Sequence, residues 1–88
     1  KKSDYIGENM KGQNLHGRDF SMSLTIVADL KSCDLHGTNF LGTDLRDANL
    51  KKSDLKENIF LTQMQVNSAM GDRDILLPYF ISRPWSWS

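Results

Sequence analysis

Ala28-Asp29-Leu30-Lys31-Ser32-Cys33-Asp34-Leu35-His36-Gly37 is the stretch that decides the fold, because it repeats one pattern every five residues. Outward from it, every fifth residue from position 5 to position 60 is large and apolar, except Thr25. The residue before each of these twelve is Asp or Asn in ten cases, the exceptions being Leu24 and Ile59. Neither an α-helix nor a continuous strand keeps every fifth residue on one face. The period therefore predicts a chain that turns a corner once per pentad.

Four corners close a square, so the pattern predicts coils of 20 residues. The sequence supports this length independently, since His16-Gly17 recurs as His36-Gly37. Stacked coils are spaced by the separation of paired strands, about 4.8 Å. Glycines near the corners, such as Gly37, permit a positive φ without steric cost. The predicted interior consists of Leu15, Phe20, Leu30, Leu35, Phe40, Leu45, Leu50, Leu55 and Phe60.

Four pentads, at residues 28–32, 33–37, 48–52 and 53–57, resemble the repeat A(D/N)LXX of the pentapeptide-repeat family. The resemblance extends over residues 3–62 and implies a right-handed, four-sided β-helix. We therefore expect an all-β solenoid of about three coils over residues 1–62. The pentad at residues 23–27 departs from the pattern, because Leu24 replaces Asp or Asn and Thr25 occupies the large inward position.

The period stops after Phe60, and residues 63–88 form the predicted carboxyl-terminal cap of the same domain. Thr62 and Gln65 have the spacing of a capping box, which predicts a short helix over residues 63–70 that Gly71 ends. The apolar tail contains two tryptophans and is suited to cover the last coil, which a solenoid otherwise exposes. Its pattern looks similar to the endings of some bacterial pentapeptide-repeat proteins. The alternative is that the tryptophan-rich end inserts into a membrane surface or a partner.

No comparable cap is visible at the amino end, where Tyr5, Met10, Leu15 and Phe20 would form an open ring. We expect either further coils before Lys1, in a longer bacterial protein, or an end-to-end contact between two copies. The second arrangement would be an isologous homodimer. The first is favoured because the chain does not begin with Met.

Basic side chains recur on two neighbouring corners and form the candidate interaction surface. We define the basic strip as Lys11, Lys31, Lys51, His16, His36 and Lys56. It could contact phosphate or an acidic partner surface, although solvated side chains are the simpler interpretation. The two histidines should stack on an outer face, but Lys56 stands where a third metal ligand would be needed. No metal and no cofactor is therefore expected.

Other chemical groups offer no catalytic centre. Cys33 occupies a small inward position, so we expect a buried packing residue with a raised thiol pKa. The Asp residues repeat at equivalent turn positions, whereas catalysis needs a distinctive pair in a pocket. A filled column also leaves no cavity for a small substrate. We therefore predict that the chain is not an enzyme.

The sequence favours a structural or protein-interaction module whose protein partner is unidentified. The chain has 11 Lys plus Arg and 11 Asp plus Glu, and this balance argues against direct nucleic-acid binding. Membrane binding is not expected, because no apolar run is long enough to span a bilayer. The family resemblance supplies the alternative, since some members imitate DNA and bind DNA gyrase, protecting it from quinolone drugs. A single buried thiol and no targeting segment favour the cytoplasm.

Overall fold

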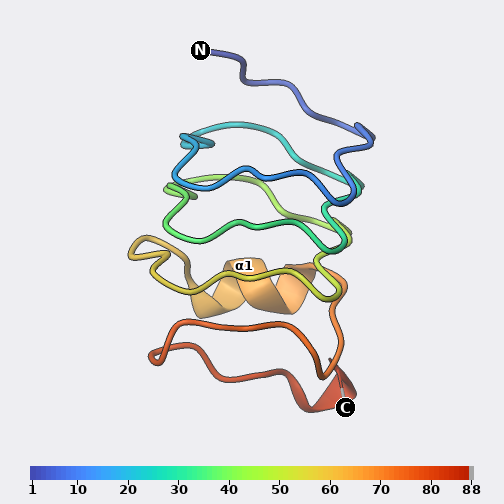
Figure 1. The fold of residues 1–88 in the computed structure, drawn as a ribbon, viewed down its shortest axis with the longest axis vertical. Helices are drawn as coiled ribbons and strands as arrows, with labels where there is room; N and C mark the ends of the chain where they lie inside the picture. The colour runs from blue at the N-terminus through green and yellow to red at the C-terminus, as the bar shows by residue number, and fades with distance from the viewer. Residues whose placement is uncertain (88) are drawn as a thin grey trace.

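The computed structural model describes residues 1–87, which wind into a column of stacked coils (Figure 1). Turns recur every five residues, from Ile6-Gly7 to Lys56-Glu57. Parallel bridges join residues 20 positions apart, from Asp4 with Leu24 to Asp34 with Asp54. The predicted coil of 20 residues with four turns is therefore confirmed. The column measures 33 × 22 × 22 Å.

The sides of the column are single parallel bridges, and the described residues form no extended strand. Each side contributes one paired residue, as where Leu30 N–H donates to Asn49 C=O at 2.8 Å and Asn49 N–H donates to Ala28 C=O at 2.9 Å. A turn every five residues leaves each side too short for a longer ladder. The predicted solenoid is therefore present, and its coils are paired through isolated parallel bridges.

The interior contains one large and one small inward side chain from most pentads. Small inward residues pair their polar atoms with backbone carbonyls, which lets them be buried. Thr43 Oγ1, for example, donates to Phe20 C=O at 2.7 Å, one coil above. Ser53 Oγ donates to Leu50 C=O at 2.6 Å within its own coil. Of the predicted interior, the buried residues are Leu15, Phe20, Leu30, Leu35, Phe40, Leu45, Leu50 and Leu55.

Phe60 was expected in this interior, and that prediction is wrong. The Phe60 side chain is 44% exposed, whereas that of Leu61 is 3% exposed. The cause is an additional turn at Ile59-Phe60, which follows the turn at Lys56-Glu57 with only the buried Asn58 between them. The chain therefore returns to the interior one position late, and Leu61 takes the place intended for Phe60.

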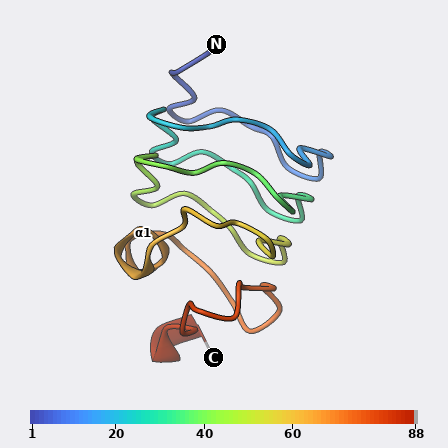
Figure 2. The same cartoon turned by 90° about the vertical axis from the view of Figure 1, so that its left-hand side faces the viewer.

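Helix α1, Gln63–Ser68, lies across one side of the column below the third coil, and Figure 2 shows it nearly end-on. The predicted capping box is present, with Thr62 Oγ1 accepting from Gln65 N–H at 3.2 Å and Gln65 Oε1 accepting from Thr62 N–H at 2.8 Å. Gln65 Nε2 also donates to Phe40 C=O at 2.8 Å, which fastens the helix to the coil above. The helix ends before the predicted residue 70, because Met70 pairs with Asn49 in extended conformation.

The tail continues the stack as a partial fourth coil. Met70 pairs with Asn49 and Leu76 with Asp54, at separations of 21 and 22 residues instead of 20. Ile75, Ile81 and Trp87 are buried beneath the third coil, and Trp87 lies in the single-turn 3-10 helix η1, Trp85–Trp87. Trp85, in contrast, is 90% exposed. Within residues 1–87, no helix combines the length and apolar character needed to cross a membrane.

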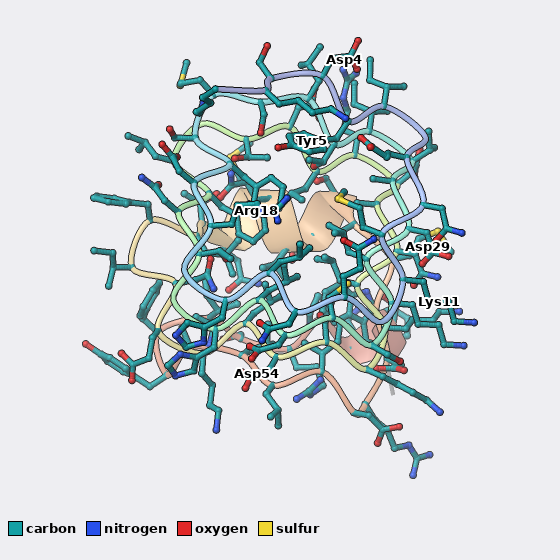
Figure 3. The ribbon with its side chains drawn as sticks, turned by 45° about the horizontal axis from the view of Figure 1, so that its top comes forward. Asp4, Tyr5, Lys11, Arg18, Asp29 and Asp54 are labelled. Atoms are coloured by element: carbon teal, nitrogen blue, oxygen red, sulfur yellow. The ribbon has the colours of Figure 1, made fainter. Side chains whose placement is uncertain are left out.

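At the amino end, polar side chains lie over the interior. In Figure 3, Arg18 and Tyr5 lie inside the outline of the first coil. The Lys2 ammonium lies 4.8 Å from the centre of the Tyr5 ring and 2.8 Å from a Glu8 carboxylate oxygen. The prediction of an open apolar ring at this end is wrong, because its four side chains are all buried: Tyr5, Met10, Leu15 and Phe20.

Candidate interaction face

The basic strip is positioned by the Asp and Asn side chains that precede its members by two residues. Asp29 Oδ1 accepts from Lys31 N–H at 3.0 Å, and Asp34 Oδ1 accepts from His36 N–H at 3.0 Å. The same contact, at 2.9–3.1 Å, holds the other four members, Lys11, His16, Lys51 and Lys56. This side-chain-to-backbone bond fixes the first residue of each turn and directs it outward.

Backbone hydrogen bonds between coils keep the strip in vertical register. Gly12 N–H donates to Lys31 C=O and Ser32 N–H to Lys51 C=O, both at 2.9 Å. The equivalent bonds to His36 and Lys56 carbonyls, from Gly17 and Gly37, are both 3.0 Å long. The strip therefore forms two columns on neighbouring corners, and Figure 3 shows Lys11 extending outward from one of them.

The lysines of the strip have no acidic partner in the described part of the chain. Its ion pairs are Lys2 with Glu8, His16 with Asp34 and Arg46 with Asp44. Asp34 and Asp54 lie between the two columns, but each uses one carboxylate oxygen to hold a backbone N–H. Like charges stacked one coil apart repel each other, so the column of Lys11, Lys31 and Lys51 is an electrostatically unsatisfied feature.

The two histidines stack as the sequence predicts. Their ring centres are 5.1 Å apart and the ring planes differ by 13°. His16 Nδ1 lies 3.8 Å from Asp34 Oδ2, and His36 Nδ1 is buried without a hydrogen-bond partner among residues 1–87. That same part of the chain contains no cluster of three His, Cys, Asp or Glu side chains able to hold a metal ion.

Cys33 lies in the interior, where it makes one polar contact. Its Sγ donates to Met10 C=O at 3.0 Å, and burial raises the pKa of the thiol. The higher pKa keeps the sulfur protonated and unreactive at neutral pH. The structure thus places Cys33 among the packing residues of the interior.

A second surface feature was missed from the sequence. An apolar hollow of about 620 Å³ lies at the corner formed by residues 56–60 and 77–80. We call it the corner hollow; it is lined by Lys56, Glu57, Ile59, Leu77, Pro78, Tyr79 and Phe80. Its one sequence signal is Ile59, an apolar residue where the repeat has Asp or Asn. Because the five-residue period places Phe60 in the interior, it does not indicate the loop at residues 56–60 that forms the hollow.

Comparison with known families identifies the repeat. A family model described as pentapeptide repeats in eight copies matches residues 28–57. This match confirms the resemblance seen in the sequence and contains the stretch Ala28–Gly37. A search of curated proteins finds no match to the chain.

Proposed function

Because the chain carries pentapeptide repeats, we propose that it is a non-enzymatic structural module that binds an acidic protein partner through the basic strip. The carrying observation is the column of lysines without acidic partners among the described residues. An acidic partner surface would relieve the repulsion within that column. We also propose the right-handed winding that the family resemblance implies, which a crystal structure would check.

The filled interior supports the non-enzymatic part of this proposal. Leu30, Leu35 and Phe40 have no exposed surface, so the column offers no internal space to a substrate. The Asp and Asn side chains that face outward are occupied in holding turns. A rigid outer surface with a fixed register of charges suits recognition of another protein.

Binding to polyglutamate tests the strip as an anion-binding surface. We expect the protein to bind it with an affinity that falls as salt increases. The double substitution Lys31→Glu and Lys51→Glu should weaken binding by about tenfold or more. The matched control is Lys1→Glu, since the Lys1 ammonium lies against the Ser21 carbonyl at the corner opposite the lysine column. If the double variant binds as tightly as the parent chain, the strip is not the binding surface.

The upper edge of the first coil supports a second candidate, an isologous homodimer. In residues 1–87, the backbone N–H groups of Asn9, Asn14 and Asp19 have no hydrogen-bond partner, although the equivalent groups of lower coils are paired. Pairing with a second copy would satisfy them. Sedimentation over a concentration series tests this, and a monomer at every concentration would exclude it.

The gyrase-binding alternative gains no support. Imitation of DNA requires a strongly acidic surface, whereas this chain has balanced charge and a basic strip. We likewise propose no direct contact with nucleic acid or membrane.

A further inference from the structure

The corner hollow combines exposed apolar side chains with a concave shape. The exposed fractions are 69% for Ile59, 99% for Tyr79 and 45% for Phe80. The Tyr79 and Phe80 rings are perpendicular, with centres 5.4 Å apart. Large apolar side chains gathered around a hollow on a small protein mark a site that binds another molecule.

The hollow exists because pairing between coils stops at this corner. Asp54 with Leu76 is the last bridge of the stack, and beyond it the loops at residues 56–60 and 77–80 separate. Figure 1 shows the two loops one above the other at the left-hand side of the column. The space that a regular fourth coil would fill therefore stays open to solvent.

Buried residues hold both loops in place. Asn58 in the upper loop is fully buried, and its Nδ2 donates to Leu35 C=O at 2.9 Å and Leu55 C=O at 3.0 Å. In the lower loop Pro78 is buried, and its C=O accepts from Ile81 N–H at 3.1 Å. The hollow is thus preformed, which lowers the entropic cost of binding.

The basic strip leads directly into the corner hollow. Lys56 belongs to both, because it ends the column of His16 and His36 and also lines the hollow. A single extended segment can therefore contact the side chains of the strip, including Lys56, and the apolar side chains at its foot. This continuity joins the two features into one surface.

We propose that the partner is an extended acidic segment with a large apolar anchor, its carboxylates lying along the strip and its anchor entering the corner hollow. This inference rests on the proposed function and adds the chemistry of the partner. A second copy does not fit, because the chain has no two adjacent acidic residues to place along the strip. A bilayer fits less well, since it takes protruding side chains and not a hollow.

Labelled synthetic peptides test the inference by fluorescence anisotropy. One peptide contains an Asp/Glu run followed by Phe-Leu, and its partner has Ser-Ser in place of Phe-Leu. We expect the anchored peptide to bind the protein about tenfold more tightly than the Ser-Ser peptide. Tyr79→Ala and Ile59→Ser should each remove this difference in affinity without weakening the binding of the Ser-Ser peptide. Trp85→Ala is the matched control, because Trp85 is 90% exposed and lies outside the hollow.

The outcomes separate the inference from the proposed function. Equal binding of both peptides, with a loss in the Lys31→Glu and Lys51→Glu double variant, would overturn the anchor and leave the strip supported. Failure of both peptides to bind would overturn the two together. Tyr79-dependent binding to phosphatidylserine vesicles that the anchored peptide does not displace would also overturn the inference, in favour of a membrane.

Discussion

Backbone conformation at one position of each pentad shapes the whole chain. Every fifth residue from Gly7 to Glu57 has a positive φ, and six of these residues are not glycine. Val27, at φ 52°, is the most strained of them, because a β-branched side chain disfavours this region. Left-handed conformation costs a non-glycine residue about 1–2 kcal/mol.

Val27→Gly should therefore stabilise the protein. The strain relieved exceeds the added entropy of unfolded glycine, so we expect the free energy of unfolding to rise by about 1 kcal/mol. Urea unfolding measures the change. Ile26→Gly, at the neighbouring turn position without a positive φ, should lower stability. A loss of stability in Val27→Gly would show that its exposed side chain makes a contact worth more than the strain.

Asp44 and Arg46 form the one arginine–carboxylate pair of the described residues. Arg46 Nη2 lies 2.8 Å from Asp44 Oδ2, and the hydrogen bonds from Arg46 lower the pKa of the Asp44 carboxyl. A lowered pKa in the folded state stabilises the protein at pH values above the unfolded pKa of aspartate. That contribution is lost as the pH falls through the folded pKa.

Arg46→Ala should consequently reduce stability most at neutral pH. The difference in unfolding free energy between the variant and the parent should shrink as the pH falls below the pKa of an ordinary aspartate. Thermal unfolding across a pH series measures it. A difference that stays constant with pH would mean that Arg46 contributes through packing of its stem and not through the carboxylate.

At the scale of elements, a buried polar network fixes the third coil. Thr38 Oγ1 donates to Asn58 Oδ1 at 2.8 Å, and Asn58 in turn satisfies the carbonyls of Leu35 and Leu55. Asn58→Ala would leave the Leu55 carbonyl without its partner, whereas Thr38 Oγ1 and the Leu35 carbonyl keep their bond to each other at 2.8 Å. Each buried group left unpaired costs about 1–3 kcal/mol.

We expect Asn58→Ala to lower the unfolding free energy by about 1–3 kcal/mol. Thr38→Val tests the network in a double-mutant cycle, where the two substitutions should be less than additive. Asn67→Ala is the control, because Asn67 is exposed and its side chain accepts from Gln63 Nε2, outside this network. Additive effects of the two substitutions would contradict the network.

The elements differ in how far the sequence predicts them. The coils and the capping box depend on local spacing, so Leu30 and Thr62 were placed correctly from sequence alone. The end of α1 and the position of Phe60 depend on pairing across the chain, which spacing does not encode. The basic strip follows from the period. The corner hollow does not, because it depends on where pairing between coils stops, after Leu76.

At the scale of the whole molecule, the two ends of the column are closed by different chemistry. Charged and polar side chains such as Glu8 and Arg18 lie at the amino end, while Ile75, Ile81 and Trp87 close the other. The apolar closure shares backbone bonds with the column, as where Leu55 N–H donates to Leu76 C=O at 2.8 Å. We therefore expect the cap and the column to unfold as one cooperative unit.

Gly71→Ala tests this coupling. A Cβ at residue 71 would lie 2.5 Å from the Trp87 ring, so Trp87 must move away. Overpacking of this kind costs about 1–3 kcal/mol. In a Trp85→Phe background, where Trp87 is the remaining tryptophan, its emission should shift toward the red and urea unfolding should occur at lower concentration. Tryptophan emission and far-ultraviolet circular dichroism should follow the same transition. A change in tryptophan emission, which reports on the cap, at a lower urea concentration than the change in circular dichroism would show that the tail is a separate unit. The coils would then be stable without it.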